Sequence, residues 1–304
     1  MSVRGWFEGK GPSGFGFGST AEQVTAGLDL HGQRILITGC NSGLGFEAMR
    51  VLALRGATVI GAARSRDKAA EACAQVSGAT EPLACELSDP ASVRAAVDEA
   101  RKGGPLAAII ANAGIMALPR LELVHGVERQ LFTNHVGHFL LVTGLLDHLT
   151  PTGRVVMLSS TAHLRAPAVG IEFDNLDGSK GYTPWAAYGQ SKLANILFSN
   201  ELARRLAGTG RTSNAVHPGV IATGLTRSLP FLFAAVWKAA SPIWLKSIAE
   251  GTATEVWAAT HPSLAGVSGE YFADCNVSPR SRQARDPALA ARLWEATEAI
   301  CARI

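Results

Sequence analysis

Paired cysteines are missing from this sequence, and their absence excludes two kinds of site. The cysteines are odd in number, lie far apart and form no C-x-x-C pair (Cys40, Cys73, Cys85, Cys275 and Cys301). A disulfide framework or a zinc site needs paired or closely spaced cysteines. We therefore predict no metal site and a reducing compartment, the cytoplasm. The N-terminus has no apolar run of signal-peptide length, which agrees with that prediction.

Long apolar runs and dense charge are also absent. No stretch reaches the roughly 20 apolar residues of a membrane-spanning helix. The best candidate, from Pro230 to Leu245, is interrupted by Lys238 and Pro242. Charged residues make up only 17% of the chain and no basic tract stands out, so we predict no nucleic-acid partner. Hydrophobic residues make up 47%, enough for the core of one large globular domain.

What the sequence does contain is a regular alternation of short apolar runs and helical patterns. The apolar runs lack a period of two, which is typical of strands buried on both faces. We predict an α/β fold, a doubly wound parallel sheet with helices on both faces and right-handed crossovers. No linker or change of composition divides it, so we expect one domain at 32–304, preceded by a glycine-rich arm at 1–31. Strands are expected at 35–37, 58–63, 82–85, 106–111, 154–158, 212–216 and 270–273, and helices at 43–54, 66–75, 89–101, 128–149, 186–207, 249–260 and 287–302.

A glycine-rich turn follows the first predicted strand and opens the first long helix. Glycines let the backbone turn sharply and approach a pyrophosphate, and the helix N-terminus supplies free N–H groups. The spacing G-x-x-x-G-x-G differs from the G-x-G-x-x-G fingerprint, and a purely structural turn is the alternative. We predict that the turn binds a dinucleotide through Gly39, Asn41, Ser42, Gly43, Leu44 and Gly45.

Two arginines, Arg64 and Arg66, follow the second predicted strand. A site for NAD usually places an acidic residue here to hold the ribose hydroxyls, whereas a site for NADP uses arginine for the 2′-phosphate. No acidic residue stands at or just after this strand end. The planar guanidinium fork suits phosphate, so we predict NADP(H) with Arg64 as a contact. The alternative is ordinary surface charge at the start of a helix.

Three further predicted strands end in small or polar residues, and ligands of open parallel sheets bind outside the carboxyl ends of the strands. Small residues let a backbone pass close to a ligand, and a serine hydroxyl there can hold a substrate oxygen. A rigid turn after the sixth strand would close over the cofactor, with Thr223 near the nicotinamide amide. A plain turn or a helix cap is the alternative in each case. The residues are Asn112, Ala113 and Gly114; Ser159 and Ser160; and Pro218, Gly219, Ile221 and Thr223.

Tyr188 and Lys192 stand four residues apart on a predicted helix and so share one face of it. An ammonium beside a phenol favours the phenolate, so we expect Lys192 to lower the pKa of Tyr188 and make it a proton donor or acceptor near neutral pH. A solvated surface pair is the alternative. His135 and His138 flank the polar residue Asn134 in another long helix, but no third metal ligand presents itself.

In this order, these motifs resemble the short-chain dehydrogenase/reductase family over residues 31 to 275. Within it the chain is most similar to the retinol dehydrogenases and to the oxidoreductase part of the WW-domain-containing oxidoreductase. The closer likeness is carried by Asn134-His135-Val136-Gly137-His138-Phe139, Ser191-Lys192-Leu193-Ala194-Asn195 and Val216-His217-Pro218-Gly219.

The resemblance implies a seven-stranded Rossmann-type sheet and a catalytic group of Asn134, Ser160, Tyr188 and Lys192. Lys192 would also bind the nicotinamide ribose, and Asn134 would hold a water that links Lys192 to solvent. Two positions depart from the family pattern. The pair Glu86-Leu87 replaces the common Asp-Leu of the adenine contact, and Ala111 replaces the first asparagine of Asn-Asn-Ala-Gly.

An apolar segment from Leu229 to Leu245 follows the last of these motifs. We expect a lid at about 225–247 over a lipophilic alcohol, aldehyde or ketone, with a subunit contact, a membrane-surface contact or simple core as alternatives. The family resemblance also implies a homodimer or homotetramer. A non-catalytic NADP-binding sensor or scaffold is the rival function, and it would be expected to lack Tyr188, Lys192 or Ser160. An epimerase or dehydratase would need a longer chain after Thr223.

Overall fold

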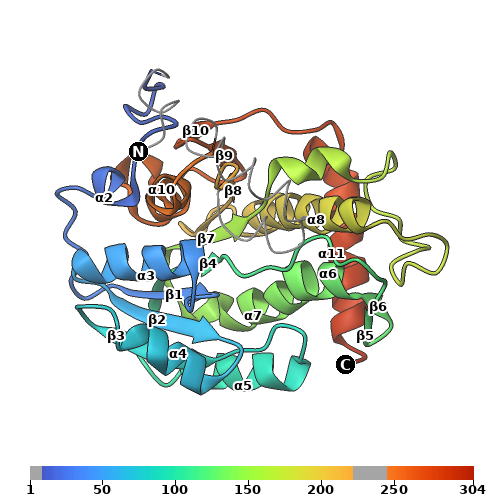
Figure 1. Ribbon diagram of the computed structural model, residues 1–304, viewed down its shortest axis with the longest axis horizontal. Coiled ribbons are helices and arrows are strands. Elements are labelled where there is room, and N and C mark those ends of the chain that lie inside the picture. Colours follow the sequence, from blue (N-terminus) through green and yellow to red (C-terminus); the bar gives the residue numbers. More distant parts are fainter. Residues whose placement is uncertain (1–8, 222–244) are drawn as a thin grey trace, which may run out of the picture.

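Eight strands form one sheet at the centre of the computed structural model, which describes residues 9–221 and 245–304 (Figure 1). Seven run parallel in the order β3-β2-β1-β4-β7-β8-β9, and the edge strand β10 pairs antiparallel with β9. The predicted doubly wound parallel sheet is confirmed, with one short strand added. The strands are β1 (Arg34–Thr38), β2 (Thr58–Ala63), β3 (Thr80–Ala84), β4 (Leu106–Ala111), β7 (Leu149–Leu158), β8 (Thr212–His217), β9 (Tyr271–Ala273) and β10 (Asn276–Val277).

Helices cover both faces of the sheet, which explains the uninterrupted apolar runs. In β1, Ile35 and Ile37 enter the core under one layer of helices, and Leu36 enters the core under the other. All of β1 after Arg34 is therefore buried. The first layer holds α2 (Ala21–Val24), α3 (Gly43–Leu54), α4 (Arg66–Cys73) and α10 (Ile248–Thr260). The second holds α5 (Pro90–Ala100), α7 (Gly137–Leu145), α8 (Pro184–Arg205) and α11 (Pro287–Cys301).

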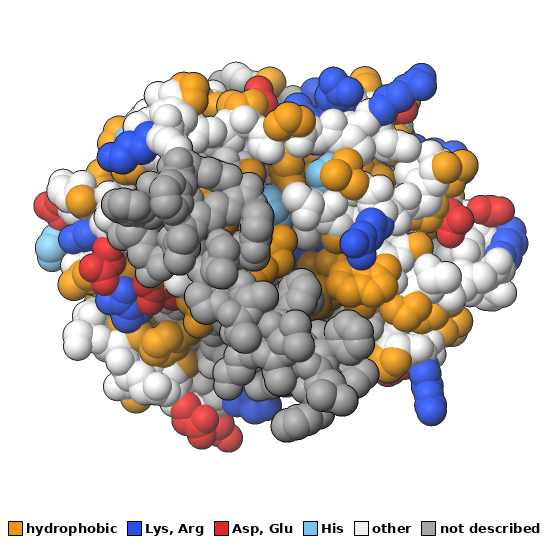
Figure 2. Space-filling model, turned by 45° about the horizontal axis from the view of Figure 1, so that its top comes forward, with side chains coloured by type: hydrophobic (Ala, Val, Ile, Leu, Met, Phe, Trp, Pro, Cys, Tyr) orange, Lys and Arg blue, Asp and Glu red, His pale blue; other side chains and the backbone are white. Residues whose placement is uncertain are grey.

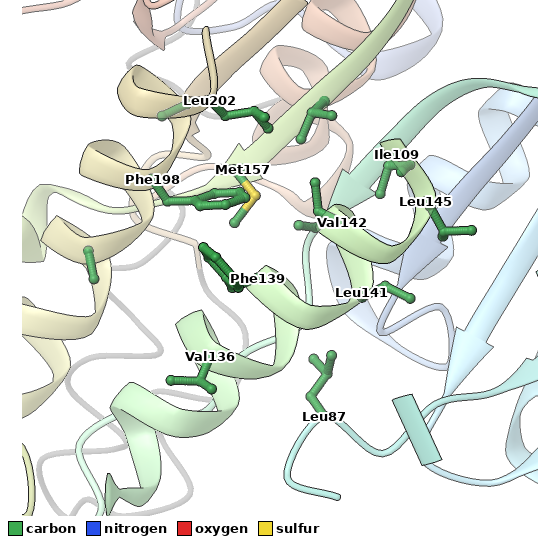
Figure 3. Packing of buried hydrophobic residues seen from close by; sticks show 14 of the residues in the cluster. Leu87, Ile109, Val136, Phe139, Leu141, Val142, Leu145, Met157, Phe198 and Leu202 are labelled. Atoms are coloured by element: carbon green, nitrogen blue, oxygen red, sulfur yellow. The ribbon is translucent and has the colours of Figure 1, made fainter. Parts of the chain in front are cut away.

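The hydrophobic core between the sheet and the second layer of helices fixes α8 against the sheet. Figure 3 shows Phe139 of α7, Phe198 of α8 and Met157 of β7 gathered between the two helices and the strand. The rings of Phe139 and Phe198 lie 5.4 Å apart between centroids. Burying a large apolar side chain contributes about 1.5–3 kcal/mol. The helix that carries Tyr188 and Lys192 is therefore held at a defined position over the strand ends.

The helix predicted at 128–149 is confirmed as an unbroken helical run over 129–148, but it is not an α-helix throughout. It divides into α6 (Arg129–Leu131), a π-helical turn (Phe132–Val136), α7 and a 3-10 turn (Leu146–His148). His138 Nδ1, from the start of α7, donates to Asn134 O at 2.9 Å, so a side chain bonds a carbonyl of the π-helical turn. Leu149 is not helical but is the first residue of β7. The pairing of β4 with β7 shifts register between Leu106 and Ala108, which leaves room for extra residues at the start of β7.

The remaining described elements are short. Two strands of two residues each, β5 (Leu123–Val124) and β6 (Val127–Glu128), pair as an antiparallel hairpin. Short 3-10 turns span Thr161–Arg165, Pro262–Leu264 and Gln283–Arg285. Helix α4 ends at Cys73, two residues before its predicted end, a difference common at helix termini. Within the described ranges, no helix is long and apolar enough to span a membrane.

Candidate functional site

Two adjoining cavities lie at the carboxyl ends of the parallel strands, where the strand order reverses between β1 and β4. One, of about 480 Å³, is lined by the glycine-rich turn and the ends of β2 and β3. The other, of about 440 Å³, is lined by residues of β7, α8 and the turn after β8. Leu44, Asn112, Gly114, Ile115 and Leu158 line both. On the face shown in Figure 2, hydrophobic side chains border a hollow near the middle of the view.

The glycine-rich turn forms a tight cradle. A Cβ atom on Gly45 would lie 2.3 Å from the carbonyl oxygen of Gly39, so only glycine fits. Gly39 itself has a φ of +75°, in the left-handed region that favours glycine. Helix α3 begins at Gly43, and its N-cap Ser42 makes no side-chain capping bond. The first N–H groups of this helix are thus free to bind an anion such as a pyrophosphate.

The first cavity contains most of the predicted cofactor contacts. The amide of Asn112 donates to the carbonyl of Thr38 at 2.7 Å and so ties the end of β4 to the turn. Thr133, which the sequence did not suggest, lines the same cavity with a buried hydroxyl that has no partner among the described residues. The cradle and this hydroxyl fit a dinucleotide. The other predicted residues in its wall are Gly39, Asn41, Ser42, Leu44, Gly45, Arg64, Glu86, Leu87, Ala113 and Gly114; Gly43 is not among them.

The two candidate arginines occupy different surroundings. Arg64 is exposed and lines the cavity. Arg66 instead pairs with Glu99 of α5, with Nη1 2.6 Å from Oε1. Arg129, whose guanidinium pairs with Glu122, also reaches this cavity. Among the described residues, Arg64 is therefore the one arginine that both lines this cavity and forms no ion pair with a carboxylate.

Ser160, Tyr188 and Lys192 come together in the wall of the second cavity. Tyr188 and Lys192 lie one turn apart on α8, and the Lys192 ammonium is 5.7 Å from the centre of the Tyr188 ring. Its Nζ donates to the carbonyl of Leu158 at 3.0 Å. Gly189 lets α8 approach the turn that carries Ser160, because a Cβ there would lie 2.7 Å from Ala162 O.

Asn134 does not line either cavity, because its side chain is fully engaged with the protein. Its Nδ2 donates to Ser191 Oγ and to Ile115 O, each at 2.9 Å, and its Oδ1 accepts from Ile115 N at 2.8 Å. Its main-chain oxygen meets the His138 ring. Asn134 therefore joins the end of β4 to α8 beside Lys192, and its expected role as a water ligand stays a prediction.

The predicted lowering of the Tyr188 pKa is contradicted, because burial outweighs the groups around the phenol. Burial raises the pKa of Tyr188 to about 12, and a hydrogen bond with Ser160 only partly opposes that shift. Burial also lowers the pKa of Lys192 to about 8. Removing a charged group from water disfavours its charged form, and the ammonium is bonded to a carbonyl rather than to the phenol. Desolvation therefore dominates the pKa values of both groups.

Pro218, Gly219 and Ile221 line the second cavity as predicted, whereas Thr223 and most of the expected lid at 225–247 lie outside the described residues. Sequence reasoning missed Met116 and Trp185, which extend the apolar wall. The Trp185 ring stands edge-on to Tyr188 at 6.2 Å. A spacing of three residues on one helix is the signal that places Trp185 beside Tyr188.

His135 and His138 are packed inside the protein rather than facing either cavity. Burial lowers the pKa of His135 to about 3 and that of His138 to about 4, so both are neutral near pH 7. His135 bonds Thr297 Oγ1 and His138 bonds Thr38 Oγ1, each at 2.9 Å. Searching the described ranges finds no cluster of three histidine, cysteine or acidic side chains able to hold a metal ion.

Comparison with known proteins agrees with this geometry. The family model of the short chain dehydrogenases matches residues 33–230. The chain is 43% identical to short-chain dehydrogenase TIC 32 B, chloroplastic, of Brassica napus, over 97% of each chain. It is 40% identical to retinol dehydrogenase 12 of Mus musculus, over 89% of this chain and 86% of that one. A crystal structure of an uncharacterised protein from Mycobacterium paratuberculosis superposes with a TM-score of 0.74 at 36% identity, over 94% and 98% of the two chains.

Proposed function

This chain belongs to the short-chain dehydrogenase family, whose members bind a nicotinamide cofactor, and from that premise we propose an NADP(H)-dependent oxidoreductase. It would interconvert a lipophilic alcohol and its aldehyde or ketone. One observation carries the proposal: Ser160, Tyr188 and Lys192 share the wall of a cavity that adjoins the cradle of the glycine-rich turn. A proton donor and a dinucleotide site at neighbouring strand ends suit hydride transfer.

In the proposed reduction, Tyr188 donates its phenolic proton to the substrate oxygen while the Ser160 hydroxyl holds that oxygen. The bound cofactor supplies the hydride. A Tyr188 pKa near 12 keeps the phenol protonated at neutral pH, as a proton donor requires. Lys192, with a pKa of about 8, is mostly charged at pH 7. Its ammonium, close to the Tyr188 ring, stabilises the phenolate that forms during transfer.

The choice of NADP(H) is supported by Arg64 at the end of β2. A 2′-phosphate in the first cavity would meet this guanidinium, and no acidic side chain stands at that strand end to favour a bare ribose. Arg66 provides a matched control, because it lies two residues away and is already paired with Glu99.

We expect Arg64→Ala to raise the Kd of NADPH by about 10- to 100-fold, the loss of one charged hydrogen bond, and to leave the Kd of NADH unchanged. Arg66→Ala should change either value by less than about twofold. Titration of intrinsic tryptophan fluorescence measures the Kd of NADPH and of NADH for the two variants and for the unmodified protein. Tighter binding of NADH than of NADPH by the unmodified protein would contradict the cofactor assignment.

The lipophilic substrate is supported by the second cavity, whose wall carries Leu44, Ile115, Met116, Trp185 and Val220. A relative that is named for retinol, itself a lipophilic alcohol, agrees with this choice. Each methylene buried against such a wall contributes about 0.8 kcal/mol. For straight-chain aldehydes, kcat/KM should therefore rise about fourfold per added carbon until the cavity is filled. Preference for small polar carbonyls would refute this substrate class.

The homodimer or homotetramer and the cytoplasmic location both remain predictions. Sedimentation equilibrium of the purified chain measures the first, and fractionation of the cells that make it measures the second.

A further inference from the structure

Lys246 is a buried cation outside the catalytic group. It is only 1% exposed, and its Nζ lies 2.5 Å from Asp274 Oδ1. The ring of Phe17 covers the ammonium at 4.8 Å from the ring centre. Burying a charge is costly unless it is paired, and an ion pair of this kind contributes little net stability. The pair therefore calls for an explanation beyond the stability of the fold.

Lys246 lies directly behind the turn that follows β8. Its main-chain N–H donates to Val220 O at 2.9 Å, and it forms a parallel bridge with Ile221. Its methylene stem packs against Gly219, where an added Cβ would lie 2.6 Å from Lys246 Cδ. Residues 217–221 form one wall of the cavity that holds Tyr188. The stem of Lys246 is thus the support on which this wall rests.

Asp274 and Phe17 reach Lys246 from two other parts of the chain. Asp274 stands in the tight turn between β9 and β10 with a φ of +53°. Asn276, the first residue of β10, holds the N-terminal arm, because its Oδ1 accepts from Ser13 N at 3.1 Å and its Nδ2 donates to Phe15 O at 3.0 Å. Figure 1 shows β9, β10, α10, α2 and the described part of the N-terminal arm at the same end of the molecule. The arm is therefore anchored where it covers the ion pair.

We propose that Phe17, Lys246 and Asp274 form a clamp that positions residues 217–221 against the nicotinamide half of the cofactor. These are positioning residues, since none of them lines the cavity itself. The inference rests on the proposed function and extends it, because it gives the N-terminal arm a part in cofactor binding. Pre-organising a wall of a site lowers the ordering cost of binding.

If the clamp acts in this way, its loss should weaken the binding of the nicotinamide half of the cofactor and leave the binding of the adenosine half unchanged. We would measure the Kd of NADPH and of adenosine 2′,5′-bisphosphate, which lacks the nicotinamide half, by titration calorimetry. Lys246→Met and Phe17→Ala should raise the Kd of NADPH by about tenfold or more and change that of the fragment by less than twofold. Asp274→Asn, at a half-buried position, should act in the same direction and serves if Lys246→Met does not fold.

The matched control is Arg34→Met. It breaks the pair between Arg34 and Glu81, 2.7 Å apart, at the amino ends of β1 and β3, away from both cavities. Both Kd values should stay within twofold of those of the unmodified protein. Unchanged NADPH binding in the clamp variants, or equal weakening of NADPH and the fragment, would overturn the clamp while leaving the proposed function intact. Failure of the unmodified protein to bind either compound would overturn both.

Discussion

Lys192 is the residue of this site whose proposed role in catalysis most clearly lowers the stability of the folded protein. It is buried on α8 with its Nζ bonded to one carbonyl, and no carboxylate of the described ranges pairs with it. Burial lowers its pKa from 10.5 to about 8, so the folded protein holds the ammonium at neutral pH against a desolvation penalty. That penalty is on the order of 3 kcal/mol, at about 1.4 kcal/mol per pKa unit. Retaining the charge makes sense only if the chemistry requires it.

We therefore expect Lys192→Met to be more stable and inactive. Removing the buried ammonium should raise Tm by several degrees at pH 7, with the gain shrinking between pH 8 and 10.5, where the folded protein already releases this proton. Carbonyl reduction should fall by about 10²–10⁴-fold. Differential scanning calorimetry and a cofactor oxidation assay measure the two effects. A lower Tm at pH 7 would show that the lysine supports the fold instead.

At the scale of elements, the close contact of α7 with the loop between β3 and α5 fixes one wall of the first cavity, next to the glycine-rich turn. A Cβ on Gly137 would lie 2.2 Å from Leu87 O, a backbone atom that cannot move independently. Leu87 is itself in the wall of that cavity. Gly144 lies farther along the same helix, and a Cβ there would meet only the Val97 side chain, at 2.9 Å.

Gly137→Ala should destabilise the protein by roughly 2 kcal/mol or more, because the helix must shift away from the loop. Gly144→Ala should change stability by less than about 1 kcal/mol, since a side chain can give way and alanine favours the helix. Urea denaturation compares the two variants with the unmodified protein. Equal losses would mean that the α7 contact is no tighter at Gly137 than elsewhere.

The sequence was sufficient for elements whose pattern is local. The buried strands, the glycine-rich turn and the shared face of Tyr188 and Lys192 follow from composition and spacing. The π-helical turn did not follow, because the Thr38 hydroxyl of β1 and the Asn134 carbonyl hold His138 from two sides, and only the fold brings them together. The pKa values did not follow either, since spacing along a helix says nothing about burial.

For the whole molecule, a small set of buried ionisable groups sets the dependence of stability on pH. Burial lowers the pKa of His135 to about 3 and those of His138 and His217 to about 4. The unfolded chain binds these protons below about pH 6.5, so stability falls as the pH decreases. Glu255 acts in the opposite direction: burial raises its pKa to about 8, so stability falls as the pH rises from its ordinary pKa toward 8.

Between pH 4 and 8, the free energy of unfolding should therefore be greatest near pH 6.5. Acidification to pH 5 should remove on the order of 3 kcal/mol, because the loss from the three histidines exceeds the gain from the glutamate. In His135→Leu, the free energy of unfolding should fall less steeply as the pH decreases below 6.5. The control His125→Gln, at an exposed position, should not change this slope. Chemical denaturation at a series of pH values tests this, and a maximum at or above pH 8 would be inconsistent with it.

The central claim is that this chain moves a hydride to a carbonyl carbon with Tyr188 as the proton donor. Transfer of label from NADPH that carries deuterium at nicotinamide C4, on the transferred face, to a long-chain aldehyde tests it most directly, with the alcohol analysed by mass spectrometry. The account predicts one deuterium per alcohol formed by the unmodified protein, and a rate lower by about 10²–10⁴-fold in Tyr188→Phe. Absence of label in every alcohol product, or an equal rate in Tyr188→Phe, would contradict it.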